Sequence, residues 1–172
     1  MRIVNGSTVE SPDREISISR IFNAPRAMVY DVWTDPKHVA VWWGPKVFTN
    51  PVCEMDVRPG GKFRIVMRAP DGAEYPYTGI YLEVVPPERL VYTDDLSEVG
   101  EDWHSLLNSF RGSVEAPPMK SFVTVTFEDL GEKTRLTVLT RFASNTDRDA
   151  MLQMQMAEGW TESLETFASL LS

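Results

Sequence analysis

Four carboxylates near the ends of predicted strands are the side chains of this sequence best suited to acid–base chemistry. A carboxyl group that is buried in a cavity keeps its proton to higher pH, because burial disfavours the charged form, and it then acts as a general base near neutral pH. Nothing in the sequence separates the four, so we assign no catalytic residue. The candidates are Glu54, Glu83, Asp94 and Asp95.

The other residues with reactive or metal-binding chemistry stand alone or have a structural interpretation. His38 and His104 have no Cys or His nearby at metal-ligand spacing, and Cys53 is the single cysteine, so we expect no metal site, no cofactor and no internal disulfide. Asp56 and Arg58 lie two positions apart beside a Pro-Gly-Gly turn, where an ion pair would stabilise a hairpin. No helix follows that turn, which argues against a phosphate-binding loop.

These side chains must be positioned by a series of strands that occupies the middle of the chain. Apolar and polar residues alternate between turn sequences, and the short connections indicate antiparallel neighbours. Two short helices are predicted between the first two strands, from Pro25 to Trp43. The predicted strands span residues 15–22, 47–57, 61–69, 74–85, 88–95, 119–129 and 133–143.

A long amphipathic helix is predicted to end the chain, from Thr146 to Leu171. Its apolar residues recur every three or four positions and form one continuous stripe. Gly159 costs such a helix ~1 kcal/mol relative to alanine, which predicts a close neighbour to the backbone there. We expect an α+β helix-grip architecture, in which a seven-stranded curved antiparallel sheet wraps around this C-terminal helix.

Size and composition narrow the classes of partner. The 172 residues fit one domain, which we place at residues 15–172 after a flexible lead-in over residues 1–14. The net charge of -8 disfavours nucleic acid, and no apolar run reaches the ~20 residues of a membrane span. We therefore expect a cytoplasmic protein, either a monomer or, through an exposed edge strand, a homodimer.

Several linked motifs resemble those of one family. They are VWTDP at residues 32–36, WWGP at 42–45, DVRPGG at 56–61, VVPPERL at 84–90 and the Gly159-Trp160 pair. Together they resemble the activators of the heat-shock protein 90 ATPase, which belong to the START-like or SRPBCC superfamily with the birch pollen allergen. The resemblance implies a deep apolar cavity between the curved sheet and the last helix, which superfamily members use for lipids, hormones or polyketides.

The residues expected to line such a cavity come from inward-facing strand positions, the tryptophans and the last helix. Strand 74–85 is ambiguous, because its tyrosines oppose Ile80, Leu82 and Val84 and either face could point inward. The same side chains could instead fill a solid core, and the two interpretations stay open. The candidate lining residues are Trp33, Trp43, Phe63, Ile65, Met67, Tyr77, Tyr81, Val123, Val125, Met156 and Trp160.

Residues 97–118 form an insertion that is longer than a compact domain normally spends on a plain loop. Trp103, Leu106, Leu107 and Phe110 fall at helical spacing within it, so their apolar side must be buried. We regard these four residues as a candidate lid over the cavity mouth. A segment packed on the sheet edge or in a dimer contact is the alternative.

Binding of a small hydrophobic molecule is the function that these patterns favour. One alternative is a module that binds a chaperone and modulates the heat-shock protein 90 ATPase, although the resemblance covers only the C-terminal domain of the eukaryotic co-chaperone. The other alternative is a cyclase- or hydrolase-type enzyme that acts on a hydrophobic substrate.

Overall fold

One large antiparallel sheet dominates the computed structural model, which describes residues 1–113 and 116–171. Over those residues the chain forms nine strands and five helices, and the strands lie in the order β1-β2-β3-β9-β8-β7-β6-β5-β4. The strands are β1 (Arg2–Val4), β2 (Ser7–Glu10), β3 (Glu15–Phe22), β4 (Thr49–Met55), β5 (Lys62–Arg68), β6 (Glu74–Val85), β7 (Arg89–Asp94), β8 (Ser121–Asp129) and β9 (Thr134–Phe142).

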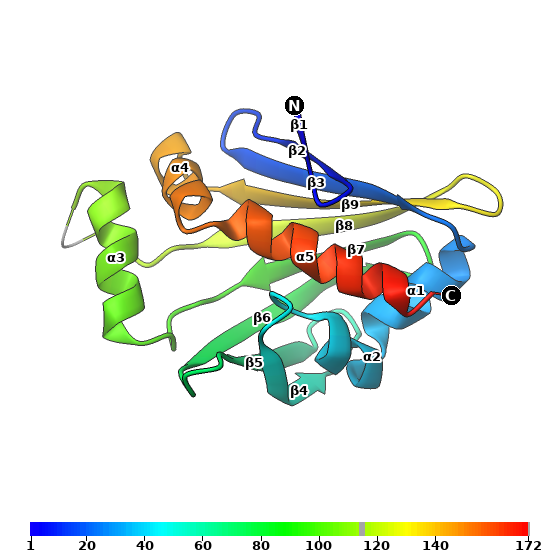
Figure 1. Cartoon of the computed structure of the whole chain (residues 1–172), viewed down its shortest axis with the longest axis horizontal. Coiled ribbons are helices and arrows are strands. Elements are labelled where there is room, and N and C mark those ends of the chain that lie inside the picture. Colours follow the sequence, from blue (N-terminus) through cyan, green and yellow to red (C-terminus); the bar gives the residue numbers. More distant parts are fainter. Residues whose placement is uncertain (114–115, 172) are drawn as a thin grey trace.

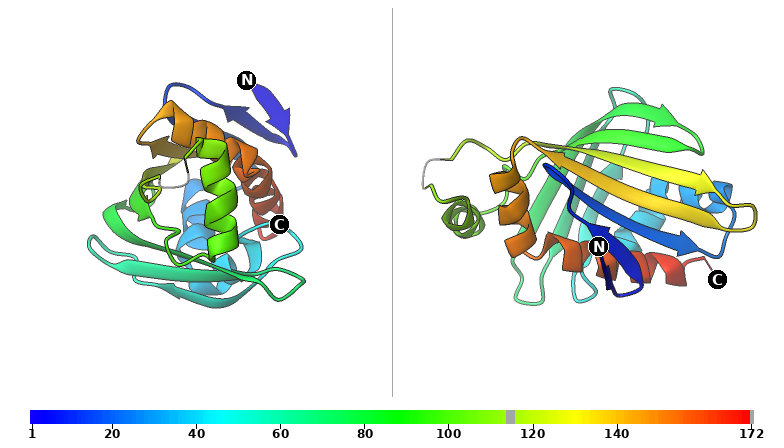
Figure 2. Two further views of the ribbon diagram at one scale, coloured as in Figure 1. Left: turned by 90° about the vertical axis from the view of Figure 1, so that its left-hand side faces the viewer. Right: turned by 90° about the horizontal axis from the view of Figure 1, so that it is seen from above.

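The helices gather on one face of this sheet, with α5 running across it (Figure 1). Figure 2 shows α3 and α4 together at one end of α5, while α1 lies at its other end. Among the described residues, no helix is both long enough and apolar enough to cross a membrane. The α+β class is confirmed, and the arrangement is consistent with a helix grip. The helices are α1 (Arg26–Thr34), α2 (Pro36–Trp42), α3 (Glu101–Arg111), α4 (Asn145–Gln153) and α5 (Met156–Ser169).

The prediction of seven strands is wrong, because the segment expected to be a flexible lead-in forms a hairpin. Strands β1 and β2 pair with each other, and β2 extends the sheet beyond β3. Asn5 and Gly6 form the turn with φ angles of 50° and 80°, the conformation that an Asn-Gly pair adopts most readily in a two-residue hairpin. Asn5 Nδ2 also donates a hydrogen bond of 3.0 Å to Thr161 Oγ1 on α5.

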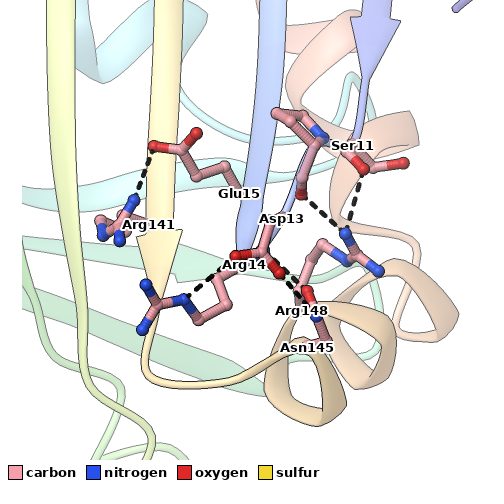
Figure 3. Close-up of polar contacts among 8 residues, drawn as sticks. Ser11, Asp13, Arg14, Glu15, Arg141, Asn145 and Arg148 are labelled. Carbon is pink, nitrogen blue, oxygen red and sulfur yellow. Dashed lines mark hydrogen bonds and ion pairs between the residues drawn. The ribbon is translucent and has the colours of Figure 1, made fainter.

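The connection from β2 to β3 is held by the first turn of α4 (Figure 3). The Asn145 side chain accepts from the Arg14 backbone N–H at 2.7 Å and donates to Asp13 Oδ1 at 2.8 Å. Arg148 donates to the Ser11 carbonyl oxygen at 3.0 Å. These contacts join residues more than a hundred positions apart, so a local sequence pattern does not reveal them.

The predicted single C-terminal helix is divided in two. Gln155 adopts a left-handed backbone conformation with φ of 65°, and α4 ends just before it while α5 begins just after it. Gly159 lies inside α5, where a Cβ atom would meet only Pro45 Cγ, at 3.8 Å. That distance is an ordinary van der Waals contact, so the expectation of a close neighbour at Gly159 is wrong.

Aromatic rings fill the core where α5 passes over α1 and α2. Phe167 of α5 lies 5.0 Å from Phe22 and 5.1 Å from Trp42, measured between ring centroids. Trp42 is fully buried, and its Nε1 donates to the Val32 carbonyl oxygen at 3.1 Å. Rings of this size bury large apolar areas, and the indole N–H needs such a partner once it is removed from water.

Two glycines should respond in opposite ways to substitution by alanine. At Gly79 in β6 a Cβ atom would lie 2.0 Å from the Thr93 carbonyl oxygen and 2.5 Å from the Phe63 ring, so we expect Gly79→Ala to lower the free energy of unfolding by about 2 to 4 kcal/mol. Gly159→Ala has room and should raise it by about 1 kcal/mol through helix propensity. Urea unfolding of both variants checks this, and equal effects would contradict it.

Candidate functional site

A cavity of about 190 Å³ lies between α5, the turn after α2 and the inner face of β5 and β6. Its wall is mostly aromatic and methionine side chains, and none of the described lining residues is Lys or Arg. Concave, largely apolar sites with few polar groups are typical of small-molecule binding. The lining residues are Trp43, Gly44, Pro45, Met67, Tyr75, Tyr77, Leu96, Val99, Trp103, Met151, Met154, Met156, Gly159, Trp160 and Ser163.

A second, outer space of about 420 Å³ adjoins this cavity beneath α3. It continues from the cavity past Phe48 of the α2–β4 connection to Gln153 and Gln155 at the break between α4 and α5. The two spaces therefore lie side by side and share part of their walls. The residues shared by both are Pro45, Met67, Tyr75, Trp103 and Met154.

The inner face of β6 carries its tyrosines, which resolves the ambiguity of strand 74–85. Tyr77 and Tyr81 are buried, whereas Ile80 and Leu82 on the other face are 39% and 46% exposed. Successive side chains of a strand alternate between its two faces, so Tyr75 shares the inner face and also lines the cavity. Two phenol rings of this face, those of Tyr75 and Tyr77, therefore line the cavity.

The structure divides the candidate lining residues between the cavity and the core. Five of them line the cavity: Trp43, Met67, Tyr77, Met156 and Trp160. Four surround a deeper void of about 10 Å³, which is too small for more than one water molecule: Trp33, Phe63, Ile65 and Tyr81. Some of these side chains therefore border open space, while others fill a packed core in a different part of the interior.

Val123 and Val125 lie in the packed core and not in the cavity wall. They are 1% and 0% exposed, and their strand, β8, lies in the middle of the sheet, where α1 packs against it. The inner face of a central strand under a helix has no space left for a ligand. The alternation correctly predicted that both side chains point to the inner face of the sheet. It does not show whether a helix or a cavity covers that part of the face.

Sequence reasoning missed Leu96 and Val99, which line the cavity from the segment between β7 and α3. No periodicity marks them, because this segment is neither strand nor helix. Met151 and Met154 also line this cavity, although only their neighbour Met156 was chosen as a candidate lining residue, because methionines in a helix are more often ordinary core residues. Their proximity to Met156 was the available signal.

The candidate lid residues fall on α3, beside the outer space. Trp103, Leu106 and Phe110 line that space, and Trp103 also reaches the inner cavity. Leu107 is 1% exposed and belongs to the hydrophobic core. Leu106 and Phe110 are 51% and 38% exposed, so the expectation that all four apolar side chains are buried is wrong for these two, because the outer space under α3 is open to solvent.

A buried ion pair joins α3 to α4. Arg111 Nε lies 2.9 Å from Asp147 Oδ1, and the two side chains are only 5% and 10% exposed. Arg111 also donates to Asn108 Oδ1 at 3.3 Å, and the Ser144 hydroxyl accepts from the Asp147 backbone N–H at 3.1 Å. Removal of one partner from such a pair leaves an uncompensated buried charge, so this contact holds α3 in place over the outer space.

The remaining residues with candidate chemistry have structural partners or lie away from the cavity. Asp56 and Arg58 form the predicted ion pair, with 2.9 Å between Oδ2 and Nε. His38 Nδ1 lies 3.4 Å from Asp35 Oδ2 on the exposed side of α2. His104 packs edge-on against Trp103, with ring centroids 5.0 Å apart.

Asp94 is the candidate carboxylate that lies on the inner face of the sheet. It pairs in register with Ser121 of β8, whose hydroxyl donates to Asp94 Oδ2 at 3.1 Å. Burial raises the pKa of Asp94 to about 6, and the nearby hydroxyl groups of Tyr77 and Ser121 limit the rise. The other three candidates, Glu54, Glu83 and Asp95, are exposed.

Two tyrosine hydroxyls complete a polar cluster around Asp94. Burial and the negative charge of Asp94 raise the pKa of Tyr77 and of Tyr92 well above the usual value, so both phenols stay protonated. Within the described chain, Asp94 Oδ1 and the Tyr92 hydroxyl are buried without a hydrogen-bond partner. The hydroxyl group of Tyr77 lies near both of these groups.

Asp94 should make the protein less stable as the pH rises. Because its pKa is about 6 in the folded state and 3.8 ordinarily, folding favours the protonated form, and the cost of the charge grows from about pH 4 and is complete above about pH 6. Asp94→Asn should therefore raise the free energy of unfolding by about 2 to 3 kcal/mol at pH 7.5 and change it little at pH 4.

Chemical denaturation at the two pH values measures this difference. The matched control is Asp95→Asn, because Asp95 is the exposed neighbour and its Oδ1 accepts from the Ser97 backbone N–H in a way that an asparagine can keep. An effect of Asp94→Asn that is the same at both pH values would show that the carboxyl group is not titrating near pH 6.

Comparison with known proteins relates this geometry to one family. The family model described as Activator of Hsp90 ATPase homolog 1-like protein matches residues 23–172. No curated protein matches the chain.

Solved structures from several bacteria are similar over nearly the whole chain. A Chromobacterium violaceum protein is 28% identical, with 92% of this chain and 96% of that chain covered and a TM-score of 0.73. A Nitrosomonas europaea protein is 25% identical, with 94% of this chain and 96% of that chain covered and a TM-score of 0.75. A Mycobacterium smegmatis protein, at 24% identity, 96% and 97% coverage and a TM-score of 0.78, shows likeness of fold alone.

Proposed function

Since this chain belongs to the Activator of Hsp90 ATPase homolog 1-like family, we propose that it binds a small hydrophobic molecule in the cavity beneath α5. The observation that carries this proposal is the cavity of about 190 Å³, lined mostly by aromatic and methionine side chains and adjoining the outer space under α3. The START-like resemblance implies a ligand in this same place, between the sheet and the last helix.

The volume sets the size of the ligand. An apolar cavity of about 150 Å³ in another protein binds benzene, so the inner cavity suits an aromatic or aliphatic group of about one or two rings. A longer molecule would extend into the outer space of about 420 Å³. The wall accommodates different shapes, because methionine side chains are flexible and polarizable, and they come from three elements: Met67 of β5, Met151 of α4 and Met156 of α5.

Helix α3 serves as the lid in this proposal. Trp103 borders both the cavity and the outer space, so movement of α3 changes access to both. The Arg111–Asp147 ion pair tethers α3 to α4 and so sets how readily the lid opens.

Gly159→Leu tests whether the cavity is the ligand site. Gly159 lines the cavity and a Cβ atom there has only Pro45 Cγ nearby, at 3.8 Å, so a leucine side chain would occupy cavity space without a backbone clash. We expect it to weaken binding of the neutral probe N-phenyl-1-naphthylamine by about tenfold or more, because the apolar contact area is lost. Probe fluorescence and quenching of the tryptophan emission measure the affinity.

Gly159→Ala is the matched control, since it adds one methyl group at the same position. It should leave probe affinity within about threefold of the original protein, a change of less than 1 kcal/mol. Circular dichroism and thermal unfolding establish that both variants fold. Undiminished binding by a folded Gly159→Leu protein would place the ligand elsewhere.

Arg111→Gln tests the lid. The substitution leaves the buried Asp147 carboxylate without its cation, so α3 should separate from α4 more often and the bound probe should dissociate about threefold faster or more. Stopped-flow displacement measures this rate. Arg148→Gln is the control, because Arg148 of the same helix donates to the Ser11 carbonyl oxygen in the β2–β3 connection. Equal dissociation rates in the two variants would contradict a lid role for α3.

A further inference from the structure

Methionine side chains are concentrated around the proposed ligand cavity. The chain has eight methionines, and four of them line the cavity: Met67, Met151, Met154 and Met156. A thioether sulfur is soft and polarizable, and it makes favourable contacts with apolar molecules and aromatic rings. It is also readily oxidised to a sulfoxide, which is polar. The groups that suit this wall to an apolar ligand are therefore groups that an oxidant can change.

Two of these four methionines can be reached from outside. Met67 and Met154 are half-buried and border both the cavity and the outer space under α3, which is open to solvent. Met151 is buried, and neither Met151 nor Met156 is among the described residues that line the outer space. A small oxidant that enters the outer space therefore meets Met67 and Met154 first.

The Met67 sulfur lies against the turn after α2. A Cβ atom at Gly44 would be only 2.8 Å from Met67 Sδ, so the backbone of Gly44 covers that side of the sulfur. An oxygen atom added to the sulfur must therefore take another side. The two spaces that Met67 borders provide room for it.

Oxidation changes the character of the cavity wall. A sulfur lone pair attacks one oxygen of hydrogen peroxide, the O–O bond breaks and an S–O bond forms. The sulfur loses two electrons, and the departing hydroxide takes the proton of the attacked oxygen and leaves as water. The sulfoxide oxygen binds water, which an apolar ligand must remove without supplying a hydrogen bond in return. Each sulfoxide in the wall therefore weakens apolar binding.

We propose that Met67 and Met154 are sites of reversible oxidation by hydrogen peroxide, and that their sulfoxides release the apolar ligand from the cavity. The proposal rests on the proposed function, because it concerns the same ligand. A bound ligand in turn covers the two sulfurs and slows their oxidation. A thiol-dependent methionine sulfoxide reductase reverses the change, since it removes the oxygen as water and restores the thioether.

Treatment of the full chain with hydrogen peroxide tests the proposal. Catalase removes the peroxide before the affinity for N-phenyl-1-naphthylamine is measured, and peptide mass spectrometry locates each added oxygen atom. We expect oxidation of Met67 and Met154 to weaken probe binding by about tenfold or more, because water must be removed from the sulfoxide oxygens. The reductase with a thiol should restore the affinity. Saturating probe present during the treatment should slow oxidation at these two residues but not at the exposed Met28.

A variant that combines Met67→Leu and Met154→Leu should resist the peroxide. Leucine keeps the apolar character and nearly the volume of methionine, so probe affinity should stay within about threefold of the original protein before treatment and change by less than about threefold after it. Met28→Leu is the matched control, because Met28 is 40% exposed and is not among the described residues that line the cavity. It should lose affinity on treatment as the original protein does.

Three results would overturn the proposal while the proposed apolar binding stands. They are unchanged probe affinity with Met67 and Met154 oxidised, an equal loss of affinity in the double leucine variant, and a loss of affinity that circular dichroism traces to unfolding. The probe-protection measurement needs no substitution, so it applies even where the double variant does not fold. Failure of the untreated protein to bind the probe would instead contradict the proposed function, and the role of oxidation with it.

Discussion

The contact between Trp160 and Trp33 fixes the height of α5 above the sheet, and the rest of the interior depends on that height. The two rings are stacked, with planes 4° apart and centroids separated by 5.9 Å. Trp160 also meets Trp43 edge-on at 5.2 Å. Large rings keep the helix away from the sheet, and beyond them the apolar stripe continues with the narrower side chain of Met156. The ring of Trp160 fills the distance between α5 and the sheet, whereas the narrower side chain of Met156 leaves space at the same distance.

The parts of the fold that follow from local pattern were predictable from the sequence. The period of two and the turn sequences placed the strands from residue 15 onward close to their observed bounds, because each signal lies within one element. The N-terminal hairpin was missed although Asn5-Gly6 is a hairpin signal, since its strands have only three and four residues. Contacts with distant residues, such as Asn5 with Thr161, hold it in place.

The break between α4 and α5 could not be predicted from the sequence either. A glutamine such as Gln155 does not signal a left-handed backbone conformation, yet the helix breaks there. Gly159 does signal a weak position in a helix, yet it lies within the unbroken α5. A glycine reports low helix propensity, and only the surroundings decide whether the chain bends there. In this protein the glycine leaves room in the cavity wall instead.

The apolar character of the candidate site was predictable from the sequence, but the set of residues that line it was not. Alternation identified inward faces, and so selected both Tyr77 in the cavity and Val125 in the core, because it does not reveal which part of a face a helix covers. The four carboxylates near strand ends looked equivalent in sequence. Asp94 differs from them through its neighbours across the sheet, Ser121 on β8 and Tyr77 on β6, and strand order cannot be read from one strand at a time.

The left-handed residue between α4 and α5 divides the cavity wall between two cooperative units. Helix α4 is tied to α3 through Asp147 and to the β2–β3 connection through Asn145, whereas α5 is tied to the aromatic core through Trp160 and Phe167. Local opening of proteins follows such units, each with its own free energy below that of global unfolding. Met151 and Met154 belong to the first unit and Met156 to the second. A ligand bound as proposed would therefore exchange through partial opening at α3 and α4, while the sheet and α5 stay folded.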